Sequence, residues 1–152
     1  MIGSKLFKKC MSHFPTGVAV VTTRFEGKRY GMTISSFCPV SLDPPLALYC
    51  LSKTANRFQP FFKSNDFVIN ILDETSAETS VLFSKNDFSA WEEEFDDNLE
   101  LKKATWCIYC TTQYRYEGGD HKIIVALVRE CKPHISKAPP LIYYKSDYHS
   151  MK

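Results

Sequence analysis

The residues best suited to chemistry lie between positions 30 and 57, where hydroxyls, amides and cations gather around two strand-like runs. The segment Gly31-Met32-Thr33-Ile34-Ser35-Ser36-Phe37 combines the β-branched and aromatic residues of a strand with three hydroxyls, which is many for a core strand. A polar turn, Ser52-Lys53-Thr54-Ala55-Asn56-Arg57, follows the apolar run 46–51. Such a turn offers backbone N–H groups, hydroxyls and two cations together, a combination that binds phosphate.

Two interpretations of these polar residues remain open. In the first, Thr33–Ser36 and Ser52–Arg57 hold the two ends of one ligand that has a planar polar head and a phosphate. In the second, the hydroxyls only end strands, and Ser52 or Thr54 caps the following helix without any ligand. Between the two segments, 41–45 is expected to leave the strand ladder, because Pro45 cannot donate a backbone hydrogen bond.

Length, composition and charge narrow the class of protein. The 152 residues fit one domain, spanning 1–152, that can bury a core of its own. A net charge of +2 with scattered basic residues argues against a nucleic-acid partner. The sequence contains no apolar run near the roughly 18 residues of a membrane helix, and no signal segment. We therefore expect a cytoplasmic, soluble protein with no membrane partner.

The cysteines are expected to be reduced thiols rather than a disulfide framework, because four of the six lie within apolar runs. Their positions are Cys10, Cys38, Cys50, Cys107, Cys110 and Cys131. The spacing of Cys107 and Cys110 falls in the middle of a predicted strand, where positions three apart point to opposite faces. Since no second Cys/His pair with zinc-site spacing exists, no metal site is expected.

The pattern of apolar residues predicts six or seven strands and a few short helices. Runs 18–23, 46–51 and 123–128 are apolar on both faces, 66–72 alternates, 105–116 and 121–131 form a hairpin, and 141–144 is a last short strand. Helices are expected at 5–13, at 58–62, and from the capping box at 75–78 to about Phe83. The acidic segment 92–100 is expected to be a solvated loop with one helical turn.

Several strands that are apolar on both faces imply a closed β-barrel whose outer face is covered by helices or by a second subunit. The helix at 5–13 is expected to cover one end of the barrel or a partner subunit. The barrel has an excess of apolar exterior, which makes a homodimer the expected assembly.

Four segments occur in a fixed order along the chain. They are Phe14-Pro15-Thr16-Gly17 with the strand to Thr23, Gly31-Met32-Thr33 through to Pro44-Pro45, Gly119-Asp120-His121, and Pro139-Pro140-Leu141-Ile142-Tyr143-Tyr144. This ordered set resembles the flavin reductase-like family, the NAD(P)H:flavin oxidoreductase components of two-component monooxygenases such as those that act on 4-hydroxyphenylacetate and phenol. The resemblance covers about residues 5–150.

The resemblance implies a mainly β, split β-barrel FMN-binding fold with a Greek-key-like closed barrel. It also implies a homodimer that binds FMN, or FAD in some members, near the subunit interface. NADH or NADPH would donate the hydride, and reduced flavin would diffuse to a separate oxygenase component. By motif, the flavin contacts would be Met32, Thr33, Ile34, Ser35, Ser36, Ser52, Lys53, Thr54, Asn56, Phe83 and Ser84. The nicotinamide dinucleotide would be bordered by Pro15, Thr16, Gly17, His121 and Tyr143, with His121 as a dinucleotide contact rather than an acid or base.

These residue types fit hydride transfer from nicotinamide C4 to flavin N5. The first step needs no catalytic acid; it needs two rings stacked within about 3.5 Å and water excluded. Donors near the flavin N1–C2=O edge stabilise the charge that reduction places there. The sequence has no G-x-G-x-x-G after a strand, so the dinucleotide is not expected to bind in the Rossmann manner.

Two other functions remain open from the sequence. One is an FMN-binding electron carrier of the same fold that reacts poorly with NAD(P)H. The other is an interaction module on a barrel scaffold that binds no flavin, although this leaves the hydroxyl strand and the polar turn unexplained.

Overall fold

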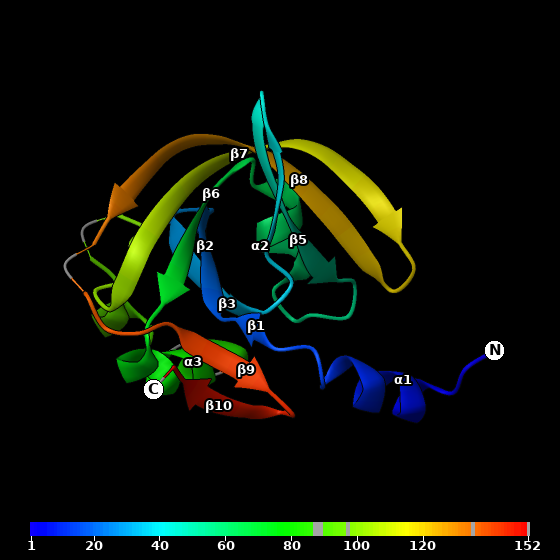
Figure 1. Cartoon of the computed structure of the whole chain (residues 1–152). Coiled ribbons are helices and arrows are strands. Elements are labelled where there is room, and N and C mark those ends of the chain that lie inside the picture. Colours follow the sequence, from blue (N-terminus) through cyan, green and yellow to red (C-terminus); the bar gives the residue numbers. More distant parts are fainter. Residues whose placement is uncertain (87–89, 97, 135, 152) are drawn as a thin grey trace.

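A computed structural model describes residues 1–86, 90–96, 98–134 and 136–151, and its strands form a large curved sheet and a small one (Figure 1). The large sheet has the order β3-β2-β6-β7-β8-β5-β4 and the small sheet the order β1-β9-β10. Among the described residues, no helix is long and apolar enough to cross a membrane. The elements are α1 (Ser4–Met11), β1 (Thr16–Gly17), β2 (Ala19–Phe25), β3 (Lys28–Ile34), β4 (Cys38–Leu42), β5 (Pro45–Ser52), α2 (Phe58–Lys63), β6 (Asp66–Leu72), η1 (Glu74–Ser76), α3 (Ala77–Ser84), η2 (Glu92–Glu94), β7 (Ala104–Gly118), β8 (His121–Pro133), β9 (Leu141–Tyr144) and β10 (Asp147–Ser150).

The large sheet curls into a barrel that is split between its two edge strands. β3 and β4 stand at the ends of the strand order, and within the described ranges they share no ladder. Beside this split, the backbone N–H of Cys50 on β5 donates to Ser36 Oγ at 3.0 Å, which joins the segment after β3 to the strand next to the other edge. The predicted mainly β, split-barrel fold is confirmed.

Buried apolar side chains form two clusters, one inside the barrel and one on its outer face. The inner cluster draws on six strands and on Phe61 of α2, and the outer cluster lies under α3, β9 and the segment 91–101. Val20 belongs to the outer cluster and Val21 to the inner one, so β2 is buried on both faces as predicted. The same alternation puts Cys107 outside and Cys110 inside, on the opposite faces that were expected.

Two strand predictions are wrong about which faces are buried. β6 does not alternate: residues 67–70 are buried on both faces, because β6 lies between β2 and β7 with a cluster on each side. β5 was expected to be buried throughout, yet it alternates, with Ala47, Tyr49 and Leu51 inward. Its other side chains, at 46, 48 and 50, are half-buried on the outer face of the barrel.

The segment 41–45 does not leave the ladder as expected. It forms the turn of the β4–β5 hairpin, in which Leu42 lies opposite Pro45. Pro45 is tolerated there because it is the first residue of its strand.

The acidic segment 92–100 is only in part the solvated loop with one helical turn that its composition predicts. The helical turn is present as η2 and Glu92, Glu93 and Asp96 are exposed, but Phe95 is buried. The side chains of Trp91 and Phe95 lie in the outer cluster, where their rings pack against Phe83. In addition, Thr79 on α3 donates to a carboxylate oxygen of Glu94 at 2.9 Å. The aromatic residues Trp91 and Phe95, four positions apart, were the signal that this segment packs on the barrel. Asp97, within the segment, lies outside the described residues.

Helix α3 begins where the predicted capping box places it, but a different residue caps the segment. The Ser76 side chain makes no capping bond for α3. Instead, the Asp73 carboxylate accepts hydrogen bonds from the Thr75 N–H and from the hydroxyls of Thr75 and Ser76. Burial opposes ionisation of Asp73, yet these bonds and one from Ser136 outweigh it and lower the pKa of the carboxyl.

The two ends of the chain differ most from the expected outline. Helix α1 does not cover the barrel: it stands away from it in Figure 1, and no residue of the helix is buried. At the other end, β10 is a strand that the sequence analysis did not predict. It returns along β9 after a turn at Lys145 and Ser146, whose φ angles of 50° and 64° are in the left-handed region.

Arg57, at the end of the polar turn, joins three parts of the fold. Its side chain is buried, with the residue 5% exposed. One terminal nitrogen, Nη1, donates to the backbone carbonyls of Gly31 on β3 and Phe83 on α3, both at 2.7 Å. The other, Nη2, donates to the Lys85 carbonyl at 2.7 Å and to Asn86 Oδ1 at 3.2 Å. Burial lowers the pKa of Arg57, but a guanidinium remains charged in proteins.

Close packing accompanies these hydrogen bonds. The guanidinium carbon of Arg57 lies 4.8 Å from the centre of the Trp91 ring. The Phe83 ring presses against the backbone of β3 so closely that a Cβ at Gly31 would lie 2.4 Å from it. The polar turn, the end of β3 and the end of α3 are therefore fixed relative to one another.

Replacing Arg57 by lysine is expected to lower the free energy of unfolding by about 2–4 kcal/mol, measured by urea denaturation. A single ammonium cannot serve the carbonyls of Gly31, Phe83 and Lys85 together, and each stranded buried carbonyl costs about 1–3 kcal/mol. The matched control is Arg24→Lys on the exposed end of β2, which should change stability by less than about 0.5 kcal/mol. Equal stabilities for the two variants would contradict the joining role of Arg57.

Candidate functional site

A cavity of about 290 Å³ opens at the end of β3, between the barrel and the small sheet. Four predicted flavin residues line it, Thr33, Ile34, Ser35 and Ser84, together with Tyr143, which was predicted for the dinucleotide. The remaining lining residues are Val18 and Tyr148. The structure thus brings the end of β3, the end of α3 and the small sheet around one hollow.

A second hollow of about 590 Å³ adjoins the first, since Val18 and Ser35 line both. It contains the predicted dinucleotide turn, Pro15, Thr16 and Gly17, beside Ser35 and Ser36. The backbone explains this proximity: Ala19 pairs with Ile34 in the β2–β3 ladder, and Thr16 pairs with Tyr143 in the small sheet. The residues predicted for two different ligands therefore share one wall.

Hydrogen bonds within the protein already engage the hydroxyls of Thr33, Ser36 and Ser84, the last of which donates to the Val81 carbonyl at 2.7 Å. Thr33 Oγ1 donates to the Ser80 carbonyl at 2.6 Å, which leaves its oxygen lone pairs as acceptors. Ser36 Oγ accepts from the Cys50 N–H and keeps its own proton to donate. Thr16 Oγ1 is different, because it is buried and has no hydrogen-bond partner among the described residues.

The polar turn after β5 is held by its own hydroxyls. Ser52 Oγ and Thr54 Oγ1 are 3.1 Å apart, and the Ser52 carbonyl accepts from the Ala55 N–H at 3.1 Å. The residue at the N-cap of α2 is Arg57, without a side-chain capping bond, so the alternative that Ser52 or Thr54 caps this helix is wrong. Asn56 is exposed in the same turn.

The turn between β7 and β8 lies directly against this polar turn. Ser52 is paired with His121 in the β5–β8 ladder, and the Lys53 N–H donates to the Asp120 carbonyl at 3.0 Å. His121 Nδ1 lies 2.7 Å from Asp120 Oδ1, and this partner lowers the pKa of the Asp120 carboxyl. The His121 side chain is 41% exposed, so it is accessible to a ligand at the polar turn.

Six predicted flavin residues line neither of these two hollows: Ser52, Lys53, Thr54 and Asn56 in the polar turn, and the packed residues Met32 and Phe83. The Phe83 side chain is fully buried against Gly31, so at this position only the neighbouring Ser84 reaches the cavity. The Met32 side chain packs against the inner cluster. Both belong to the packing that supports the site rather than to its surface.

Sequence reasoning missed Tyr148 and the supporting role of Ser80. The hydroxyl of Tyr148 lies 2.7 Å from Ser80 Oγ, and its ring lies 5.5 Å from that of Tyr143. Tyr148 therefore completes the wall of the cavity from β10. A signal was present, because short runs that each contain a tyrosine flank the two-residue turn at 145–146.

A third hollow, of about 750 Å³, lies at the far end of the β2–β3 hairpin from these two. It is lined by Arg24, Gly27, Lys28, Arg29, Tyr30, Trp91 and Glu92, none of which was predicted for a ligand. Arg29 there pairs with the Glu92 carboxylate and donates to the Asp96 carbonyl at 3.0 Å. A large volume alone does not make this hollow a ligand-binding site.

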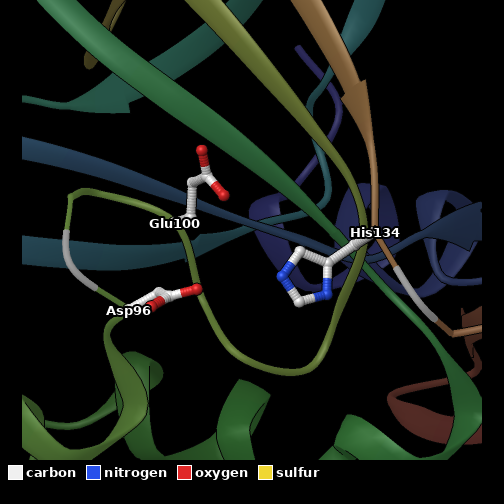
Figure 2. Close-up of side chains that lie close together, drawn as sticks. All are labelled: Asp96, Glu100 and His134. Atoms are coloured by element: carbon white, nitrogen blue, oxygen red, sulfur yellow. The ribbon is translucent and has the colours of Figure 1, made fainter.

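Figure 2 shows a cluster outside both site hollows that contains Asp96, Glu100 and His134. One potential ligand atom from each lies within 4.8 Å of the others. The Glu100 carboxylate is already bonded to the Tyr109 hydroxyl, and Lys132 Nζ lies 3.4 Å from the same oxygen. A cation would have to share this carboxylate with an ammonium group, so we assign no metal to the cluster.

Comparison with known proteins agrees with this architecture. The flavin reductase like domain family matches residues 11–152. NADH-dependent FMN reductase AsuE2 of Streptomyces nodosus subsp. asukaensis is 29% identical over 99% of this chain and 86% of the relative. The reductase component of 4-hydroxyphenylacetate 3-monooxygenase of Thermus thermophilus is 31% identical over 93% of each chain.

The solved structures include a similar fold over almost the whole length. Flavin reductase PheA2 in its native state superposes with a TM-score of 0.88 at 28% identity, covering 99% of both chains. Together with the family match over residues 11–152, this likeness supports the family that the four sequence segments indicated. The chain belongs to the flavin reductase-like domain family.

Proposed function

We propose that this protein is an NADH-dependent flavin reductase that reduces FMN and releases the reduced flavin to a separate oxygenase component. The observation that carries the proposal is the shared wall of two adjoining hollows. One contains the predicted flavin residues at the end of β3 and the other the predicted dinucleotide turn at 15–17. The names of the relatives support the same reaction, since they include an NADH-dependent FMN reductase and a monooxygenase reductase component.

The residues present fit a flavin and a dinucleotide. Thr16 Oγ1 is a buried hydroxyl without a partner among the described residues, and leaving such a group unpaired is costly. The hydroxyls of Ser52 and Thr54 and the Lys53 cation lie together in an exposed or half-exposed turn, as a phosphate site requires. We infer that the flavin ring binds at 33–36 and its phosphate at 52–56.

When bound, the nicotinamide supplies a hydride that flavin N5 accepts, and one further proton from solvent completes the reduced flavin. The protein contributes orientation and exclusion of water. The hydroxyls of Thr33 and Ser36 each make one hydrogen bond within the protein. That bond fixes the direction in which each hydroxyl can accept or donate a further hydrogen bond. Tyr143 and Tyr148 wall the cavity with aromatic surface, and the Thr16 hydroxyl and His121 contact the dinucleotide.

Turnover with free flavin separates this function from an electron carrier of the same fold. Under anaerobic conditions, NADH with FMN in large excess over protein should bleach the oxidised flavin absorbance far beyond one equivalent of protein. NADPH and FAD, run in parallel, measure the cofactor preference. Bleaching that stops at one equivalent would favour the carrier, and a protein that binds no FMN would favour the interaction module.

Substituting His121 tests its assignment as a dinucleotide contact. We expect His121→Ala to raise the KM for NADH about three- to tenfold, with a smaller effect on kcat, because one hydrogen bond to the dinucleotide is lost. His134→Ala, near the opposite end of β8, is the control and should leave both constants unchanged. If His121→Ala left KM and kcat for NADH unchanged, the assignment would be dropped.

We also propose that the protein is a homodimer. Helix α1 has no buried residue, and Leu6, Phe7 and Met11 on it are at least half exposed. The outer face of β5 carries half-buried apolar residues at 46, 48 and 50, and β4 beside it exposes Val40 and Leu42. A monomer rarely exposes this much apolar surface, and a second copy of the chain would cover it.

Sedimentation velocity tests the homodimer. The wild type should sediment with twice the 17.5 kDa mass of the chain, and Phe7→Glu should shift it toward the monomer, because a buried charge opposes association. Lys8→Glu, on the same helix but at a charged position, should remain dimeric. A monomeric wild type at micromolar concentration would overturn the proposal.

A further inference from the structure

A three-residue charge cluster connects the polar turn to the β7–β8 hairpin. Lys53 Nζ lies 2.7 Å from Glu117 Oε2 and also donates to the Gly119 carbonyl at 2.7 Å. The other carboxylate oxygen of Glu117 accepts from Lys122 Nζ. One carboxylate thus bridges two ammonium groups, directly beside the hydroxyls of Ser52 and Thr54.

We propose that Glu117 competes with the phosphate of the flavin for Lys53 and thereby sets the affinity for phosphorylated flavin. This inference rests on the proposed function, because it requires the flavin phosphate to bind at the turn 52–56. Glu117 is then an affinity-setting residue that weakens the hold on FMN, which suits a flavin that must leave after it is reduced.

The geometry makes the competition direct. Lys53 is the one member of the cluster that belongs to the polar turn itself, so a phosphate bound by Ser52 and Thr54 would approach the same ammonium that Glu117 holds. A phosphate monoester carries a charge of about −1.5 to −2 at neutral pH, against −1 for a carboxylate. A bound phosphate therefore attracts Lys53 more strongly than Glu117 does, but the ion pair between Lys53 and Glu117 must break first.

Glu117 can give up Lys53 without losing all its partners. Its second oxygen stays on Lys122, whose side chain is only 20% exposed and whose Nζ lies 5.4 Å from the centre of the Phe62 ring. The Glu117 side chain is itself 66% exposed, so water can replace Lys53 as its partner. An exposed ion pair of this kind is weak, and the competing effect is accordingly modest.

The competition operates across the physiological pH range. Hydrogen bonds from Lys122 and Lys53 lower the pKa of Glu117 to about 2, so the carboxylate is charged near neutral pH. The charged groups bonded to it are the two lysines; the Asp120 carboxyl, in the same hairpin turn, is bonded to His121, which lowers its pKa.

The test compares FMN with riboflavin, which has the same ring but no phosphate, by titration of flavin fluorescence. Glu117→Gln should tighten the Kd for FMN by about two- to fivefold, as expected for removing one exposed ion pair, and leave riboflavin unchanged. The gain should fade at 1 M NaCl, where exposed charges are screened. Glu130→Gln, an exposed carboxylate on β8 opposite Tyr109, is the matched control and should change neither Kd.

The outcomes separate this inference from the proposed function. If the wild type binds FMN more tightly than riboflavin but Glu117→Gln leaves the FMN affinity unchanged, the role of Glu117 is overturned and the flavin reductase proposal stands. Equal tightening of FMN and riboflavin would also overturn it, because the effect would not pass through the phosphate. If the wild type binds neither flavin, the proposed function and this inference fail together.

Discussion

The guanidinium of Arg57 is the constraint on which the candidate site depends. It is buried, and it donates hydrogen bonds to carbonyls of β3 and α3 while its own backbone forms the end of the polar turn. A buried charge is stable only when its donors are paired, so these segments have to remain where the guanidinium can reach them. One side chain therefore sets the spacing between the proposed ring end of the site and its proposed phosphate end.

The barrel supplies the other fixed distances. Antiparallel pairing of β2 with β3 places Ala19 opposite Ile34, and pairing of β5 with β8 places His121 opposite Ser52. The small sheet then places Tyr143 and Tyr148 over the open end. Function in such a site comes from position rather than from a reactive side chain, which suits a hydride transfer between two bound molecules.

Much of the fold and of the candidate site could be predicted from the sequence, because the sequence signals were local. The hydroxyls at 33–36, the polar turn at 52–57 and the hairpin turn before His121 stand out by residue type, and the order of four segments indicated the family. Strand alternation likewise separated Cys107 from Cys110 correctly. Local pattern also located α3, although the Asp73 carboxylate, and not the predicted capping box at 75–78, caps this segment.

What the sequence could not predict depends on contacts between distant segments. Three such contacts join residues 26 to 52 positions apart. They are the hydrogen bond from Thr33 to the Ser80 carbonyl, the packing of Phe83 against Gly31, and the hydrogen bond from Arg57 to the Phe83 carbonyl on α3. The acidic composition of 92–100 concealed the packing of Phe95, and the run 46–51 concealed that only alternate residues of β5 face the core. Composition reports what a segment contains, whereas burial depends on which neighbours the fold gives it.

The most direct measurement of the central claim is a crystal structure of the protein soaked with FMN. The account predicts density for the three-ring system in the cavity at the end of β3, with the phosphate within hydrogen-bond distance of Ser52, Lys53 or Thr54. Flavin bound instead in the hollow at the Gly27 turn, or a phosphate held away from the turn 52–56, would contradict it.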